Sequence, residues 1–237
     1  MKKPEMILFD YGQTLVNEAP FDGVKGTEAV LRYCTENKYN MTAEQIQREA
    51  DAIKNELGRF DPARRHLFQV EVPRNMFSSY LYELLGIRIS LTPEEEDRIF
   101  WDAASPGKPT EGVTEFLDYL NRQGIRTGVI SNISYCGQVV EQRIRGLFPW
   151  HPFEFILSTS EYMFRKPNKR IFQLALEKAG LEAEKVWYIG DQYECDIVGA
   201  AGAGIFPVWY IGAIDMPYTS HKEVLTAGSW EEIRRLL

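Results

Sequence analysis

The chain has 237 residues, of which 44% are hydrophobic and 13% are aromatic. This is enough apolar material for a packed core, and it excludes wholesale disorder. The 34 acidic residues outnumber the 27 lysines and arginines, which gives a formal net charge of −7. We therefore expect no broad nucleic-acid interface and no polybasic attraction to a membrane. At roughly 150 residues for a typical domain, the length predicts one large domain or one domain with a substantial insert.

Features of membrane, exported and zinc-binding proteins are missing from the sequence. The longest mostly apolar stretch, residues 204–214, is much shorter than the roughly 20 residues of a membrane helix. The three cysteines, Cys34, Cys136 and Cys195, are widely spaced and form no CxxC pair. A disulfide framework and a structural zinc site are therefore not expected. We expect a cytoplasmic protein.

Five short apolar runs predict β-strands. Each run is continuous rather than alternating, which is typical of strands that are buried on both faces of a parallel sheet. Turn-forming or small residues follow most of them. The runs cover residues 6–9, 126–130, 153–157, 186–189 and 205–211.

Helical patterns separate the later strands. From about residue 109 onward strand and helix alternate, which predicts an α/β fold with a doubly wound parallel sheet. The expected helices of this part span residues 113–120, 167–179, 196–203 and 230–237.

Residues 16–108 interrupt this alternation with helical patterns only. Capping boxes that begin at Thr42 and Thr92 predict two of the helix starts. We therefore expect an inserted all-helical cap domain at 16–108, within a core made of residues 1–15 and 109–237. The expected cap helices span residues 27–36, 42–57, 76–85 and 92–103.

Polar side chains follow the predicted strands at the points where the strands end. In a parallel α/β sheet, ligands bind outside these carboxyl ends, at the switch in strand order. Taken alone, each residue is more simply a turn or helix cap, but their order and placement together predict one shared site. The groups are Asp10 with Thr14, Ser131 with Asn132, the segment that carries Lys166, and Asp191 with Asp196.

The charges of these groups indicate a metal site. Three carboxylates and one ammonium group sum to −2 in a partly desolvated cleft, which is costly unless a cation neutralises them. Mg²⁺ binds oxygen ligands and needs only one or two carboxylates. The metal and Lys166 would then bind a phosphoryl group, and a carboxylate beside it could attack the phosphorus to give an aspartyl-phosphate.

At these positions the sequence resembles the haloacid dehalogenase superfamily. Residues 9–15 (FDYGQTL) match its first motif at the first Asp and the Thr, and residues 129–132 (VISN) match the second. Residues 165–167 (RKP) match the third, and residues 188–200 (YIGDQYECDIVGA) match the fourth nearly throughout. The resemblance covers essentially the whole chain, and the predicted helical insert stands where this family places its first type of cap.

The resemblance implies roles for the phosphoryl-binding residues. Asp10 would be the nucleophile. Ser131 and the adjacent amide of Asn132 would hold phosphoryl oxygens, together with Thr14 from the first motif. Lys166 would neutralise the charge of the phosphoryl group and of the nucleophile. The substrate would be a small phosphorylated metabolite, and the cap would close over it and exclude water.

The resemblance also implies a Mg²⁺ site. Asp10, Asp191 and the backbone carbonyl of Gly12 would be its ligands. Asp196 would support the metal-bound waters or Lys166 from behind. These positions follow from the motif matches, residue by residue.

Gly12 is the one clear departure from the family's phosphatases. They carry a second aspartate at this position, which acts as general acid and base. Loss of such help costs roughly 10²–10⁴-fold in rate, so alkyl phosphates should be poorer substrates than acyl or aryl phosphates. Tyr11, Gln13 or Glu18 could supply the proton instead, and the sequence does not decide among them.

Gly12 also leaves other functions open. A catalytically silent phospho-ligand-binding protein is the main alternative. A dehalogenase-like hydrolase would show a similar Tyr-Gly pair and need no metal, which the pair Asp191 and Asp196 argues against. A phosphonate-cleaving enzyme would need a cap lysine such as Lys54, which the helical pattern instead places on a solvated face.

The cap arginines Arg59, Arg64 and Arg65 are a candidate contact for a second anionic group of the substrate. A solvated loop between helices is the interpretation that we favour. The oligomeric state is open as well.

Overall fold

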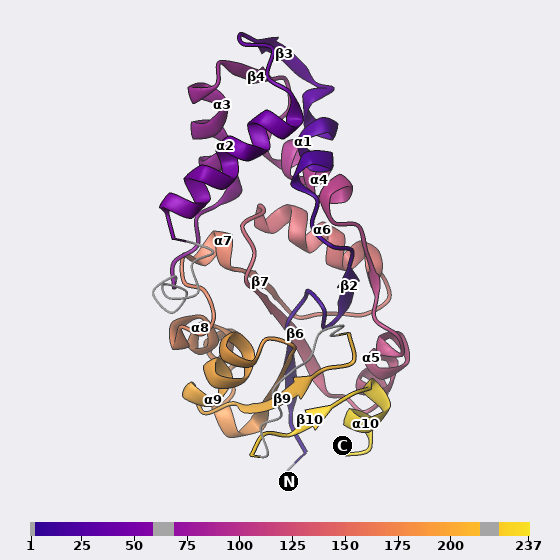
Figure 1. Ribbon diagram of the computed structural model, residues 1–237. Helices are drawn as coiled ribbons and strands as arrows, with labels where there is room; N and C mark the ends of the chain where they lie inside the picture. Colours follow the sequence, from indigo (N-terminus) through magenta and orange to yellow (C-terminus); the bar gives the residue numbers. More distant parts are fainter. Residues whose placement is uncertain (1–2, 59–68, 214–222) are drawn as a thin grey trace.

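The computed structural model describes residues 3–58, 69–213 and 223–237. Its centre is a six-stranded sheet in which every pairing is parallel (Figure 1). The chain starts in the middle of the sheet, adds strands on one side and then adds strands on the other, so the predicted doubly wound sheet is confirmed. In spatial order the strands are β10 (Thr226–Ala227), β9 (Phe206–Tyr210), β8 (Val186–Gly190), β1 (Met6–Phe9), β6 (Arg126–Ser131) and β7 (Ile156–Ser158).

The central strand β1 is buried on both faces. Met6 and Leu8 belong to one apolar cluster, Ile7 and Phe9 belong to the other, and all four are 0% exposed. This explains why the run is continuously apolar rather than alternating. One face of the sheet is covered by α5 (Val113–Arg122), α6 (Gly137–Leu147) and α10 (Trp230–Arg234), and the other by α8 (Lys169–Ala179) and α9 (Gly199–Gly202).

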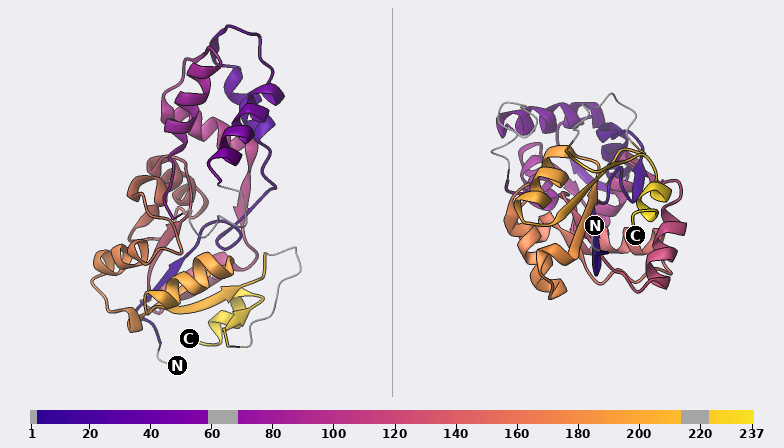
Figure 2. Two further views of the ribbon diagram at one scale, coloured as in Figure 1. Left: turned by 60° about the vertical axis from the view of Figure 1, so that its left-hand side comes forward. Right: turned by 90° about the horizontal axis from the view of Figure 1, so that it is seen from below.

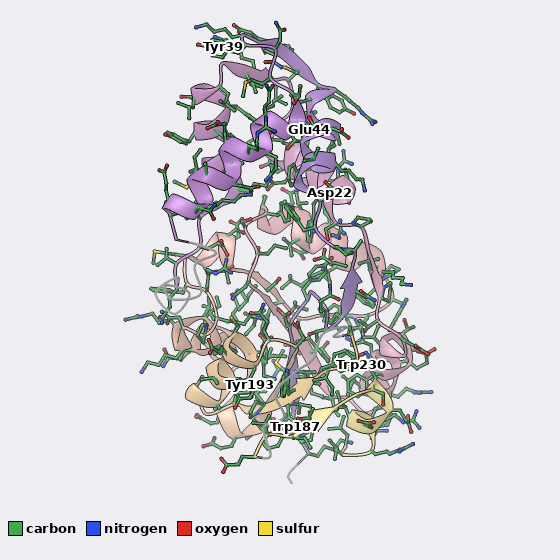
Figure 3. The ribbon with its side chains drawn as sticks, in the orientation of Figure 1. Asp22, Tyr39, Glu44, Trp187, Tyr193 and Trp230 are labelled. Atoms are coloured by element: carbon green, nitrogen blue, oxygen red, sulfur yellow. The ribbon has the colours of Figure 1, made fainter. Side chains whose placement is uncertain are left out.

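Aromatic side chains anchor the C-terminal helix α10 to the first of these faces. The ring of Trp230, labelled in Figure 3, stacks on Tyr210 with a centroid distance of 4.5 Å and on Phe116 with a distance of 5.1 Å. It also lies 5.9 Å from the ring of Phe9. The last helix therefore supports β1 directly, one residue before the first candidate site residue.

Four helices form a second lobe at the end of the molecule that lies opposite both termini (Figures 1 and 2). Two short antiparallel strands accompany them, so the segment is mainly helical rather than all-helical. The elements of this lobe, which we call the cap, are α1 (Gly23–Leu31), β3 (Cys34–Asn37), α2 (Ala43–Glu56), α3 (Arg74–Leu84), β4 (Ile87–Ile89) and α4 (Pro93–Ala104).

The two chain segments that join cap and core run side by side. Strand β2 (Val16–Glu18) leads into the cap, and β5 (Gly107–Pro109) leads out of it. The two strands pair antiparallel, with Val16 opposite Pro109. The proposed domain division, 1–15 and 109–237 against 16–108, passes through this ribbon.

Both predicted capping boxes are present. The Thr42 side chain accepts a hydrogen bond from the backbone of Gln45, whose own side chain accepts one from the Thr42 backbone. Thr92 and Glu95 make the same exchange at the start of α4, with proline as the first helical residue.

Several predicted boundaries are wrong. The helix expected over 27–36 is α1, which begins at Gly23 behind an Asp22 cap and ends at Leu31. Glycine inside α1 is explained by packing, because a Cβ at Gly26 would lie 2.8 Å from the Phe100 ring. Residues 34–37 form β3, whose partner β4 lies about fifty positions later and leaves no local signal.

Smaller corrections concern the later elements. The strand expected over 153–157 begins only at Ile156. Helix α8 begins at Lys169 with Asn168 as its cap, so Pro167 precedes it instead of lying in its first turn. Short helical segments complete the chain at α7 (Thr159–Tyr162), η2 (Ala183–Lys185) and η3 (Tyr193–Val198), a π-helical turn. Among the described residues, no helix combines the length and apolar character that crossing a bilayer requires.

Candidate active site

The ends of three adjacent strands bring the candidate residues to one edge of the sheet. Strand β1 pairs with β6 on one side and with β8 on the other. Asp10 follows β1, Ser131 is the last residue of β6, and Asp191 follows β8. The switch in strand order lies at β1, which is where ligands bind in open α/β sheets.

Lys166 lies at the centre of this group, with 2% of its side chain exposed. Its Nζ donates to Asp10 Oδ1 at 2.5 Å, to Asp196 Oδ1 at 2.7 Å and to the Tyr188 hydroxyl at 2.6 Å. These three acceptors match the three protons of an ammonium group. Burial lowers the pKa of Lys166, but the two carboxylates outweigh it and raise the pKa above its ordinary value. The side chain is therefore a fixed positive charge.

The backbone of Lys166 is held by the Asn132 side chain. Asn132 Nδ2 donates to the Lys166 carbonyl at 2.8 Å, and the Lys166 backbone nitrogen donates to Asn132 Oδ1 at 2.8 Å. This exchange fixes the lysine segment to the end of β6. The neighbouring Ser131 is 3% exposed. Within the described part of the chain its hydroxyl makes no hydrogen bond, which leaves it available to a ligand oxygen.

Three carboxyl groups crowd together beside Lys166. One oxygen from each of Asp10, Asp191 and Asp196 lies within 4.8 Å of the others. Burial, together with the neighbouring carboxylates, raises the pKa of Asp191 to about 8. Burial also raises the pKa of Asp10 to about 6, although Lys166 works in the opposite direction. One ammonium group therefore does not balance the negative charge of the cluster.

The donor set fits Mg²⁺. Asp10 and Asp191 offer carboxylate oxygens, which hard divalent cations prefer, and the crowding of these carboxylates would be relieved by a cation. Thr14 Oγ1 donates to Asp191 Oδ1 at 3.3 Å and steadies that side chain. Thr14 therefore contacts a candidate metal ligand, and its predicted role in phosphate binding stays a prediction.

Both carboxylate oxygens of Asp196 already accept hydrogen bonds from the protein. Its Oδ1 accepts from Lys166, and its Oδ2 accepts from the Gln192 backbone at 2.9 Å. A Cβ at Gly190 would lie 2.4 Å from the Asp196 carboxyl carbon. Glycine at this position therefore lets the carboxylate of η3 approach the end of β8. The arrangement suits a residue that orients Lys166.

A sequence model described as "Hydrolase: haloacid dehalogenase-like hydrolase" matches residues 4–204. The chain belongs to the haloacid dehalogenase-like hydrolases. The resemblance seen in the motifs is thereby confirmed.

Individual relatives of this hydrolase carry different names. Pyrimidine 5'-nucleotidase YjjG of Escherichia coli K12 is 27% identical over 209 residues, which are 87% of this chain and 86% of the relative. Glyceraldehyde 3-phosphate phosphatase of Methanothermobacter thermautotrophicus is 35% identical over 100 residues, 41% of this chain and 42% of the relative. The solved 2-haloacid dehalogenase of Pseudomonas syringae pv. Tomato DC3000 has a TM-score of 0.66 at 20% identity, covering 100% of this chain and 98% of that one. That likeness shows the fold alone.

Sequence reasoning missed Tyr188 as a site residue of this hydrolase. Besides accepting from Lys166, its hydroxyl lies 3.2 Å from the carbonyl of Ile130 and 3.2 Å from Asp196 Oδ1. The signal was a tyrosine inside an otherwise apolar strand, because a buried phenol needs a hydrogen-bond partner.

A contact between the cap segment and the site loops was also missed. The Glu71 carboxylate forms an ion pair with Arg165 and accepts from Thr159 Oγ1 at 2.8 Å. Val70 and Phe164 form an isolated β-bridge next to it. The chain that leaves α2 is thereby attached to the residue that precedes Lys166.

The remaining sequence candidates occupy different places. Tyr11 is turned toward Arg143, whose Nε donates to the Tyr11 hydroxyl at 2.9 Å. Gln13 donates from Nε2 to the Glu18 carbonyl at 3.0 Å. Lys54 pairs with Asp51 on its own helix at 3.2 Å. The cap arginines 59, 64 and 65 lie outside the described residues.

Proposed function

We propose that this haloacid dehalogenase-like hydrolase is a Mg²⁺-dependent phosphatase that acts on a small phosphorylated metabolite through an aspartyl-phosphate at Asp10. The observation that carries the proposal is the contact of Lys166 Nζ with Asp10 Oδ1 at 2.5 Å, beside the carboxylate of Asp191. This contact places a carboxylate that can attack phosphorus next to a fixed positive charge. Transfer of a phosphoryl group needs both. Two of the relatives are named as a nucleotidase and a phosphatase.

The proposed reaction has two displacements at phosphorus. An oxygen of Asp10 bonds to phosphorus while the bond from phosphorus to the leaving oxygen breaks. Water then attacks the same phosphorus, the bond to Asp10 breaks, and inorganic phosphate is released. Ser131 and the amide of Asn132 bind the phosphoryl oxygens during both displacements, and the positive charge of Lys166 stays beside Asp10. A bound Mg²⁺ would add positive charge against the same oxygens.

Two other hydrolase types fit the residues less well. A metal-independent dehalogenase has no use for Asp191, whose pKa is raised by burial and by the neighbouring carboxylates of Asp10 and Asp196. A phosphonate-cleaving enzyme needs a cap lysine that reaches the substrate. Lys54 is engaged with Asp51 and lies 5.7 Å from the centre of the Phe77 ring, both of them cap residues.

A catalytically silent phospho-ligand-binding protein remains the second candidate, because Gly12 stands where the usual proton donor would be. Such a protein would bind phosphorylated metabolites without releasing phosphate. The complete set of Asp10, Lys166 and Asp191 favours turnover instead, since binding alone needs no nucleophile.

We also propose a cytoplasmic location. Cys34, Cys136 and Cys195 form no disulfide within the described residues, which fits a reducing compartment. Because three carboxylates outnumber the one ammonium group at the site, a small anionic metabolite would need the positive charge of a bound Mg²⁺ in addition to Lys166.

The proposal is tested with nitrophenyl phosphate as substrate, with and without Mg²⁺. Wild-type protein should release phosphate only with the metal, and Asp10→Asn should abolish release. Asp118→Asn, on the exposed side of α5, is the matched control and should retain full activity. Turnover in the presence of a chelator, or full activity in Asp10→Asn, would contradict the proposal.

A further inference from the structure

The loop after Asp10 folds back on itself and returns the chain to Gly12. The Gln13 nitrogen donates to the Val16 carbonyl at 2.7 Å, and the Val16 nitrogen donates to the Tyr11 carbonyl at 3.0 Å. Gln13 adopts a φ of 51° in this turn. Because of the reversal, the side chain of Glu18 in β2 lies beside Gly12, six positions earlier.

A carboxylate oxygen of Glu18 lies close to the position where another residue in place of Gly12 would carry its Cβ. A Cβ built at Gly12 would have Glu18 Oε2 at 3.7 Å, and apart from Tyr11, Gly12 and Gln13 no other described residue would have an atom within 4 Å of it. An aspartate at this position would extend its carboxyl group into that space. The oxygen of Glu18 therefore lies at the edge of the volume that the missing carboxyl group would occupy.

The two oxygens of Glu18 have different surroundings. Oε1 accepts from Trp101 Nε1 at 2.8 Å and from the Tyr11 hydroxyl at 3.2 Å, and Arg143 Nη2 lies 3.6 Å away. Within the described ranges, no hydrogen bond reaches Oε2. A proton on this carboxyl group therefore belongs on Oε2, the oxygen that faces Gly12. The side chain is 19% exposed.

We propose that Glu18 is the proton donor and acceptor of this site and replaces the carboxyl group missing at position 12. The inference rests on the proposed phosphatase function. In the first displacement, the proton on Oε2 passes to the leaving oxygen as its bond to phosphorus breaks, which gives a neutral alcohol and a Glu18 carboxylate. In the second, this carboxylate takes a proton from the attacking water as the new oxygen–phosphorus bond forms, which restores the acid.

The electrostatic surroundings agree with this role. Burial raises the pKa of Glu18 by more than Arg143 and the hydrogen bonds from Trp101 and Tyr11 lower it. An acid that donates near neutral pH needs such a raised pKa. Tyr11 is the other titratable neighbour, and burial raises its pKa far above neutrality, so it stays a neutral donor.

The residues that surround the Glu18 carboxyl group come from both the cap and the core. Trp101, which orients Oε1, belongs to α4 of the cap and is 2% exposed. Its ring stacks on Tyr135 at 4.5 Å, and the Arg143 guanidinium lies 4.2 Å from its centroid. Proton donation by Glu18 therefore depends on the cap being seated on the core.

The test is the dependence of kcat/KM on the leaving group across phenyl, nitrophenyl and dinitrophenyl phosphates. Glu18→Gln keeps an oxygen for Trp101 and replaces the acidic group by an amide, which does not donate or accept the transferred proton. The variant should lose roughly 10²–10⁴-fold on phenyl phosphate, whose leaving group needs a proton, and less than about tenfold on dinitrophenyl phosphate. Glu115→Gln, exposed on α5, should match the wild type on all three.

A second substitution, at position 12, tests whether the activity lost in Glu18→Gln can be restored. In the Glu18→Gln background, Gly12→Asp should restore phenyl phosphate hydrolysis by at least about tenfold. Gly12→Asp alone should gain little, because two carboxyl groups would then compete for one place. An equal loss on all three substrates in Glu18→Gln, or no loss at all, would overturn the role of Glu18. Turnover by the wild type without Mg²⁺, or turnover by Asp10→Asn, would instead overturn the phosphatase function itself.

Discussion

The carboxylate of Asp97 in cap helix α4 accepts a hydrogen bond from the backbone nitrogen of Cys136, at the start of core helix α6, with a distance of 2.7 Å. The other oxygen of Asp97 accepts from Arg74 Nη1 at 2.9 Å, and the same nitrogen donates to Glu96 at 2.7 Å. The Arg74 backbone also donates to the Ser134 carbonyl at 2.7 Å. Cap and core are therefore joined through a buried ion cluster.

Replacement of Arg74 by methionine should destabilise the protein by about 3–5 kcal/mol, because it leaves two buried carboxylates without their cation. Urea unfolding at neutral pH measures the loss. Arg88→Met is the matched control: its ion pair with Glu36 is exposed, so the expected loss is below about 1 kcal/mol. Equal losses of unfolding free energy in Arg74→Met and Arg88→Met would show that the buried ion cluster stabilises the protein no more than an exposed ion pair does.

His151 should make stability sensitive to acid. Its Nε2 lies 2.8 Å from Thr127 Oγ1, and its Nδ1 is buried without a partner among the described residues. Burial lowers the pKa of His151 from 6.5 to about 4. The unfolded chain therefore takes up this proton first, so the stability that depends on neutral His151 is complete above pH 6.5 and is lost as the pH falls toward 4.

The size of the effect follows from the two pKa values of His151. At 1.36 kcal/mol for each pH unit between them, the loss from pH 7 to pH 4 is about 3 kcal/mol. His151→Phe fits the neighbouring aromatic cluster with Phe153 and should lack this part of the pH dependence. Thr127→Val keeps the imidazole of His151 and should therefore retain this pH dependence. Unfolding free energies of the three proteins between pH 4 and 7 would disprove the assignment if their slopes coincide.

Magnesium should stabilise the wild-type protein by mass action. A ligand at 100 times its Kd contributes about 2.7 kcal/mol, which appears as a higher melting temperature. Asp191→Asn should lose this response to Mg²⁺. In a chelator the same variant should melt above the wild type, because it removes one of three crowded carboxylates. Asp118→Asn should behave as wild type in both conditions. A Mg²⁺ response that survives in Asp191→Asn would remove Asp191 from the metal site.

The parts predicted well from sequence are those that depend on local pattern or on sheet geometry. Buried parallel strands read as short apolar runs, and both capping boxes formed as expected. Because the carboxyl ends of parallel strands share one edge, motif order alone was enough to bring Asp10, Lys166 and Asp191 together. Their catalytic roles stay predictions until the variants are measured.

The parts that were missed depend on contacts between distant segments. Strand β3 exists because β4 pairs with it, and neither has a strong pattern of its own. The place of Glu18 depends on a left-handed residue at Gln13 and on Trp101, which is 83 positions away. The hydrogen bond from Lys166 to Tyr188 likewise appears only when β8 and the lysine segment are packed.

The pairing of Val16 with Pro109 determines how freely the inserted cap segment can vary. Since β2 and β5 meet as neighbours, the gap that the inserted segment must span stays the same whatever its length or sequence. A different insert could be accommodated there at little cost in chain-closure entropy, and the sheet edge that carries Asp10 would not be disturbed. Another insert could therefore replace the cap without moving Asp10, but it would have to supply its own hydrogen-bond donor to Glu18 in place of Trp101.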